Sequence, residues 1–145
     1  MQYGGSGTWR EVGDDVDIRE QPPLPPPFAT QVAWDGAAAV VRVQGELDDS
    51  TSPRLRGLLG DLRQKQPAVV VIDLREVSLL ASAGLAVLIA VHDQFLPDAK
   101  VKVVAPSTTP AMRSVLLTSL DQLLDVHPTV EAALTSDQAD QSPPK

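Results

Sequence analysis

The 145-residue chain contains no cysteine, and aromatic residues make up only 3% of it. The missing cysteine excludes disulfides, thiolate metal sites and cysteine nucleophiles. So few aromatic rings leave little to stack on nucleic-acid bases, and the hydrophobic core must be built from aliphatic side chains. A core of Val, Leu, Ile and Ala is typical of a small α/β sheet with buried strands.

Positive charge is also scarce, because 12 Lys and Arg residues face 19 Asp and Glu residues, which gives a net charge of −7. Such a chain is repelled by phosphate backbones and anionic lipids, so we expect neither nucleic acid nor a membrane as partner. No apolar run approaches the ~18 residues that span a bilayer, and the N-terminus lacks the features of a signal peptide. We therefore expect a cytoplasmic protein that binds another protein or a small ligand.

Proline and acidic residues divide the chain into segments. Residues 1–28 are acidic and end in a proline-rich stretch, so we predict a disordered leader. A stiff spacer is the favoured interpretation of these prolines, and an SH3-type ligand is the alternative. Residues 135–145 are polar and predict a flexible tail. The remaining residues, 29–134, have the size and composition of one globular domain.

Hydrophobic periodicity predicts the elements of this domain. We expect strands over 30–34, 38–44, 68–74, 100–105 and 123–126, and helices over 51–65, 84–95, 110–117 and 128–134. Asp35-Gly36 predicts a hairpin turn, and Pro53, Pro110 and Pro128 suit the first turns of helices. The order ββαβαβαβα predicts an α/β fold, a mixed sheet of about five strands with about four helices packed on it. A functional site is expected at strand ends, near helix N-termini.

The most informative stretch is residues 69–90, a buried strand and a loop that lead to Ala81-Ser82-Ala83-Gly84 at a helix start. A serine just before a helix can cap its free amides, and small neighbours leave the serine hydroxyl uncrowded. From position alone, an N-cap is the simplest interpretation of Ser82. Periodicity does not distinguish this structural role from a functional one.

Two motifs carry a resemblance to a known family. The stretch IDLREVSLLASAGLAVL, residues 72–88, resembles the signature of STAS domains in bacterial anti-sigma factor antagonists, where a strand ending in DL leads to a D-S-S/T-G-L-G turn and a helix. The stretch from Gln44 to Asp48 resembles the G-E-L-D element of the same family. The resemblance covers roughly residues 30–134 and implies a single STAS-type domain.

The resemblance implies a non-catalytic partner switch. The unphosphorylated antagonist binds an anti-sigma factor, itself a serine kinase, and thereby releases a sigma factor. Phosphorylation, at the position that aligns with Ser82, ends the binding, and a PP2C-type phosphatase is a further partner. The chain departs from the motif at Ala81, where the family has Asp, and at Ala83, where it has a second hydroxyl. The implied partner-binding residues are Asp48, Asp49, Ser50, Thr51, Ala81, Ser82, Ala83, Gly84 and Ala86.

Two of these assignments have a structural alternative. Ala83 and Ala86 form a stripe with Ala90 that would admit a partner helix closely, or that simply fills a helix with favourable residues. Thr51 belongs either to a contact loop or to the cap of the first helix, for which Ser52 is the other candidate.

Other functions remain open. Ser82, Asp125 and His127 occur in the order of a hydrolase triad, although Leu80 stands where a nucleophile elbow has glycine. A scaffold or ligand-sensing STAS module is the alternative to the antagonist. His92 and His127 have no second ligand at metal spacing, and no glycine-rich phosphate loop is present, so we expect no metal, no cofactor and no enzymatic activity.

Overall fold

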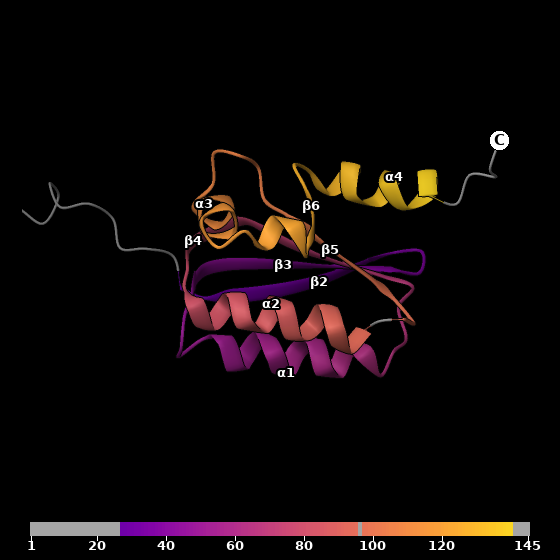
Figure 1. Cartoon of the computed structure of the whole chain (residues 1–145). Coiled ribbons are helices and arrows are strands. Elements are labelled where there is room, and N and C mark those ends of the chain that lie inside the picture. Colours follow the sequence, from indigo (N-terminus) through magenta and orange to yellow (C-terminus); the bar gives the residue numbers. More distant parts are fainter. Residues whose placement is uncertain (1–26, 96, 141–145) are drawn as a thin grey trace, which may run out of the picture.

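The structure is a computed structural model, and it describes residues 27–95 and 97–140 (Figure 1). The strands are β2 (Ala29–Asp35), β3 (Ala38–Leu47), β4 (Val69–Leu80), β5 (Lys100–Val104) and β6 (Asp125–His127). The helices are α1 (Ser52–Arg63), α2 (Ser82–Phe95), α3 (Pro110–Leu117), the short 3-10 helix η3 (Leu120–Gln122) and α4 (Val130–Asp140). Most of the predicted leader, residues 1–26, lies outside the described residues, as do residues 141–145.

The five strands form one mixed sheet in the order β2-β3-β4-β5-β6. The hairpin β2–β3 is antiparallel, with Asp35 opposite Ala38, and the other three pairs are parallel. Parallel neighbours need a crossover connection, and α1, α2 and α3 lie in those connections. The predicted α/β fold, with a mixed sheet of five strands and four α-helices, is confirmed.

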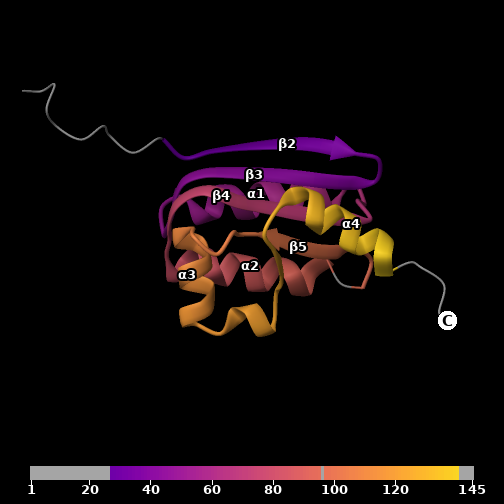
Figure 2. The same cartoon turned by 90° about the horizontal axis from the view of Figure 1, so that it is seen from above.

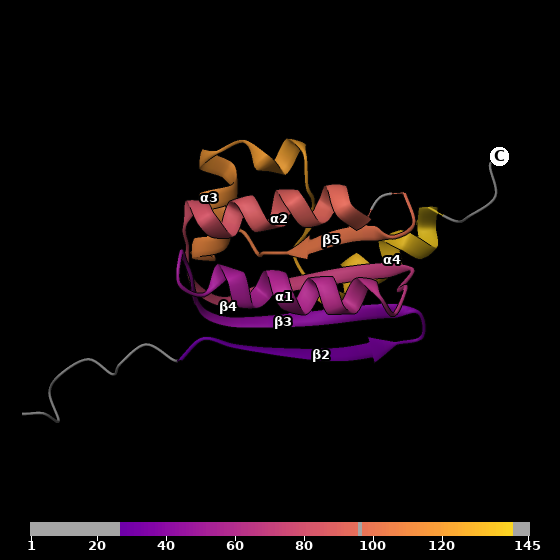
Figure 3. The same ribbon diagram turned by 90° about the horizontal axis from the view of Figure 1, so that it is seen from below.

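Helices cover both faces of the sheet. α1 and α2 lie side by side on one face (Figure 3), and α4 lies on the opposite face (Figure 2). The larger buried cluster lies under α1, α2 and α3, and it includes Val41, Leu55, Ile72 and Leu88. The smaller cluster lies under α4 and consists of Ala38, Val69, Val71, Val104 and Ala133. Both clusters are aliphatic apart from Phe95, as the composition predicts.

Strand β4 is longer than predicted, since it continues past Leu74 to Leu80. Its second half pairs in parallel with β3, with Val77 opposite Gly45 and Leu80 opposite Leu47. The pairing is irregular, because the register shifts between Arg42 and Gln44 and again after Gly45. These irregularities break the alternation of buried and exposed side chains, so residues 75–80 resemble a loop in the sequence.

The C-terminal elements also differ from the prediction. The last strand covers residues 125–127 instead of 123–126. α4 begins at Val130, where the Thr129 hydroxyl accepts a hydrogen bond from the Ala132 amide at 2.9 Å, and not at Pro128. The helix runs past Leu134 to Asp140, so residues 135–140 are helical instead of a loose tail. In the part of the chain that the structure describes, no helix is both long and apolar enough to cross a membrane.

Candidate functional site

The loop between β3 and α1 meets the start of α2 where the parallel strands β3 and β4 end. Leu47 and Leu80 are the last paired residues of these strands. One residue further on, the Ala81 amide donates a hydrogen bond to the Leu47 carbonyl oxygen at 3.0 Å. After β3 the chain enters α1 through a short loop, and after β4 it enters α2 almost directly. Both helices therefore begin beside the C-terminal ends of these strands (Figure 3). Asp48, Asp49, Ser50, Ala81 and Ser82 consequently line one open depression.

Asp48 organises the loop between β3 and α1. Its Oδ1 accepts hydrogen bonds from the Ser50 hydroxyl at 2.8 Å, the Ser50 amide at 2.9 Å and the Thr51 amide at 3.2 Å. These bonds, foremost the one from the Ser50 hydroxyl, hold the pKa of Asp48 below its ordinary value. The Asp48 carboxylate is therefore ionised at neutral pH, and it fixes the path of the loop.

Thr51 occupies the N-cap position of α1, but its side chain makes no cap hydrogen bond to the helix. Its hydroxyl instead accepts from the Asp48 amide at 2.9 Å and donates to the Glu46 carbonyl at 2.7 Å. Of the two alternatives for Thr51, the side-chain cap is therefore wrong, although the residue stands at the N-cap position. Thr51 ties the loop back to the end of β3.

Ser82 is exposed and is the first residue of α2. The Leu85 amide donates to the Ala81 carbonyl at 3.1 Å, which gives Ala81 the N-cap position. The interpretation of Ser82 as the N-cap is therefore wrong by one residue. Ser82 belongs to the first helical turn, and its sequence neighbours Ala81 and Ala83 are half-buried.

Gly84 is buried beneath this turn. A Cβ at residue 84 would lie 2.8 Å from side-chain carbons of both Leu47 and Leu80. Only glycine lets the start of α2 rest this closely on the ends of β3 and β4. Gly84 thus supports the turn from below, and it offers a partner little surface.

Gly45, in the G-E-L-D element, has a comparable structural role. Its φ is +94°, and a Cβ there would lie 3.0 Å from the Phe28 Cα. The residue therefore needs both the left-handed region and space for the backbone that enters β2. Gly45 sets the path of Glu46, Leu47 and Asp48 toward the site.

Ala83 and Ala86 line a groove between α1 and α2. Ala90, the third member of the predicted stripe, does not line it. The groove is also lined by residues that the sequence did not single out as functional, namely Ser52, Pro53, Arg56, Gly57 and Val87, together with Asp49. Nothing in the sequence indicated them, because the groove depends on how the two helices pack.

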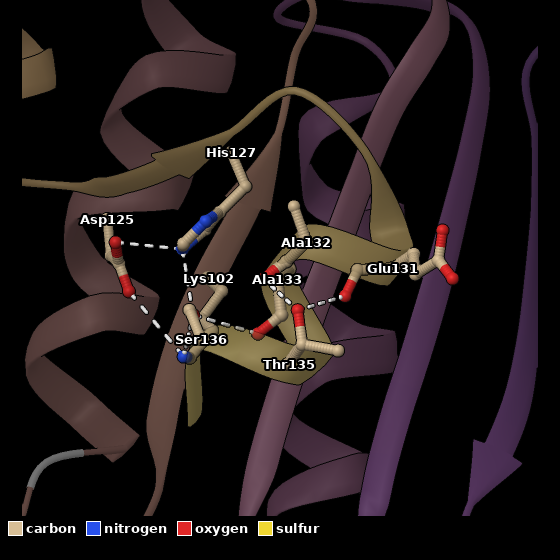
Figure 4. A network of polar contacts seen from close by, with 8 residues as sticks. All are labelled: Lys102, Asp125, His127, Glu131, Ala132, Ala133, Thr135 and Ser136. Atoms are coloured by element: carbon tan, nitrogen blue, oxygen red, sulfur yellow. Dashed lines mark hydrogen bonds and ion pairs between the residues drawn. The ribbon is translucent and has the colours of Figure 1, made fainter. Parts of the chain in front are cut away.

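The candidate triad of Ser82, Asp125 and His127 is not assembled. His127 Nε2 lies 2.9 Å from Asp125 Oδ1, and the serine that it approaches is Ser136 of α4, whose Oγ lies 3.4 Å away (Figure 4). Both contacts use the same ring nitrogen, whereas a hydrolase triad uses opposite nitrogens. Lys102 completes this group, with its ammonium 2.6 Å from Ser136 Oγ.

The other histidine of the described ranges contacts a single carboxylate. His92 lies beside its sequence neighbour Asp93, with 3.4 Å between Nδ1 and Oδ1. No group of three or more potential metal ligands occurs among residues 27–95 and 97–140.

Comparison with known proteins agrees with the fold. The STAS domain family model matches residues 30–133 of this chain. The anti-sigma-F factor antagonist RsfB of Mycobacterium tuberculosis (strain H37Rv) is 32% identical over 111 residues, which cover 77% of this chain and 90% of RsfB. The chain therefore belongs to the STAS domain family. Its similarity within the family is to anti-sigma factor antagonists, which are regulatory proteins.

Solved structures lead to the same assignment. The crystal structure of an anti-sigma factor antagonist from Mycobacterium paratuberculosis matches with a TM-score of 0.73 and 34% identity, over 78% of this chain and 97% of that one. The Bacillus cell fate determinant SpoIIAA, in its phosphorylated form, matches with a TM-score of 0.55 and 21% identity, over 74% and 98%. At that identity the similarity to SpoIIAA concerns the fold alone.

Proposed function

We propose that this protein is an anti-sigma factor antagonist, which binds an anti-sigma factor in the cytoplasm and so releases a sigma factor. The observation that carries the proposal is the exposed Ser82 hydroxyl, held beside the Asp48 loop by the hydrogen bond between Ala81 and Leu47. Asp48, Asp49, Ser50 and Ser82 would form the contact surface. Thr51 and Gly84 would hold that surface in shape.

Phosphorylation of Ser82 would be the switch. The anti-sigma factor would act as the kinase, transferring the terminal phosphoryl group of ATP to the Ser82 oxygen, and a PP2C-type phosphatase would hydrolyse the phosphoserine. SpoIIAA, which shares the fold, has been solved in both an unphosphorylated and a phosphorylated form. A phosphate adds nearly two negative charges and three oxygens to the residue that carries it.

The position of Ser82 suits this chemistry. The first turn of a helix has free amides and the positive end of the helix dipole, so α2 would tolerate a phosphate there. The same phosphate would repel the Asp48 carboxylate and would stand in the way of a partner that contacts this loop. The free protein would remain folded while its affinity for the partner falls.

The absence of an Asp before Ser82 does not remove the basis for the proposal. The backbone hydrogen bond from the Ala81 amide to Leu47 places Ser82, and that bond is independent of the side chain at residue 81. The Asp48 loop supplies acidic groups on the other side of the depression.

The test is a binding titration against each anti-sigma factor of the host, with wild type, Ser82→Ala and Ser82→Asp. We expect the alanine variant to bind like wild type. The aspartate variant should bind at least about tenfold more weakly, which corresponds to about 1.4 kcal/mol. Incubation with the bound factor and ATP, followed by mass spectrometry, should add one phosphate to wild type and none to Ser82→Ala. Equal affinity of all three proteins would contradict the switch.

A further inference from the structure

The sheet has two edges, and they differ in how well they are protected. β6 forms one edge with only three residues, and Asp125 places a charge on it. β2 forms the other edge with seven residues, of which Gln31 to Asp35 are all exposed. Among the described residues, β3 is the only strand that pairs with β2. An edge strand presents a row of backbone amides and carbonyls that another strand can bind.

β2 lacks the features that usually keep an edge strand from pairing. The strand contains no proline and no lysine, and its single charged residue, Asp35, stands at its end. No bulge interrupts it, because all seven residues pair with β3 in one continuous register. The edge is therefore a straight template on which a further strand can add.

Two large apolar side chains accompany this edge. Val32 and Trp34 are 37% and 44% exposed. They lie opposite Val41 and Ala39 of β3, so they belong to the face of the sheet that α1 and α2 cover. β2 lies outside α1 in this view of the face, and neither helix covers it (Figure 3). A strand added at the edge would remove more of both side chains from water.

A second copy of the chain fits this edge by symmetry. In an antiparallel pair, hydrogen-bonded and non-hydrogen-bonded residue pairs alternate, so two symmetric strands must meet with one residue opposite itself. Val32 is the middle residue of β2, and a centre at Val32 pairs all seven residues. Trp34 then lies opposite Thr30 of the second copy. Asp35 lies opposite Ala29 of the second copy, so like charges do not face each other.

We propose that the chain forms a dimer in which β2 pairs antiparallel with β2 of a second copy, centred on Val32. The two sheets join into one, with α1 and α2 of both copies on the same face. In the described sheet each chain has one such edge, so the pairing closes at two copies and does not continue into a fibre. The Asp48 loop and α2 take no part in the pairing, so the inference is independent of the proposed function.

Charge swapping at residue 32 tests the register. Sedimentation velocity of wild type should show a shift from monomer to dimer between micromolar and millimolar concentrations. Val32→Lys and Val32→Asp each remove the apolar contact and place like charges opposite each other, so each should weaken the dimer at least tenfold. An equimolar mixture of the two variants should dimerise again, because opposite charges then meet. A wild type that stays monomeric at millimolar concentration, or a mixture that does, would overturn the inference.

Single cysteines test the same geometry. The chain has no cysteine, so Val32→Cys carries one thiol. Opposite residues of an antiparallel pair have Cα atoms about 4.5–5.5 Å apart, which a disulfide can bridge. Asp35→Cys is the matched control, because the position is also exposed but lies about 20 Å from its own copy. In a glutathione redox buffer, Val32→Cys should form at least tenfold more disulfide dimer than Asp35→Cys. Equal yields, as expected if another segment of the same chain covers β2, would contradict the pairing.

Discussion

The Ala81 amide donates a hydrogen bond to the Leu47 carbonyl oxygen at 3.0 Å, one residue beyond the last pair of β3 and β4. This bond extends the parallel ladder into the start of α2. It fixes Ser82 relative to Asp48 through backbone atoms, whichever side chain stands at residue 81. The sheet therefore sets the position of Ser82 relative to Asp48. A substitution that disturbs the ends of β3 and β4 should displace both residues.

Gly84→Ala should destabilise the fold. The added Cβ would lie 2.8 Å from Leu47 and from Leu80, so α2 must shift away from the strand ends. We expect the free energy of unfolding in urea to fall by about 1–3 kcal/mol, as for other overpacked sites. Gly60→Ala is the control, because its Cβ meets nothing within 4 Å and should stabilise α1 by up to about 1 kcal/mol. A stabilising effect of both variants would contradict the close packing at Gly84.

Gly45→Ala should also destabilise the fold, for two reasons that can be separated. Gly45 has a φ of +94°, and its Cβ would press on the Phe28 backbone at 3.0 Å. Gly36 has a φ of +61° with nothing within 4 Å of a Cβ, so Gly36→Ala measures the conformational cost alone. That cost is about 1–2 kcal/mol. In urea unfolding, Gly45→Ala should lose more free energy of unfolding than Gly36→Ala. Equal losses in the two variants would show that the contact with Phe28 does not contribute.

Most elements could be predicted because their patterns are local. Residues 110–117 form the predicted helix, since Pro110 and the apolar spacing act within one segment. The second half of β4 was missed because its burial pattern depends on irregular pairing with β3. The second half of α4 was missed because residues 135–140 are polar and give no apolar period.

The site could be predicted only in part, for a related reason. The resemblance brought the residues around Asp48 and Ser82 together, and the structure places them in one depression. The unpaired Ser52 hydroxyl and the open space at Gly57 arise from the packing of α1 against α2. Lys102 is 1% exposed and bonds Ser136, 34 positions away, so no local pattern predicts its burial.

The Asp48 loop should depend on pH. The folded-state pKa of Asp48 lies below its ordinary value of 3.8, so its contribution to stability is fully present above pH 3.8 and is lost as the pH falls through the folded-state pKa. Asp48→Asn does not titrate. Wild type should therefore be more stable than Asp48→Asn at pH 7, and the difference should shrink below pH 3.8.

Urea unfolding of both proteins at pH 7 and at pH 3 measures this change. Asp49→Asn is the control, because in the described part of the chain the loop amides of Ser50 and Thr51 bond Asp48 and not Asp49. A difference between wild type and Asp48→Asn that stays constant with pH would show that the Asp48 charge does not stabilise the loop.

Ser136 should be important because it satisfies a buried charge. Its hydroxyl accepts from the Lys102 ammonium at 2.6 Å and donates to the Ala133 carbonyl at 3.0 Å, while Asp125 lies 3.8 Å from the same ammonium (Figure 4). Ser136→Ala removes the short contact and leaves the ammonium with the more distant carboxylate. We expect the free energy of unfolding to fall by about 1–3 kcal/mol.

Lys102→Met tests the same network from the other side. Methionine has a similar length and no charge to satisfy, so the variant should be within about 1 kcal/mol of wild type or more stable. In the Lys102→Met background, Ser136→Ala should cost about 1 kcal/mol less than in wild type, because the buried ammonium is gone. Urea unfolding of the four proteins gives this coupling energy. A coupling of zero would mean that Ser136 stabilises α4 through its helix contact alone.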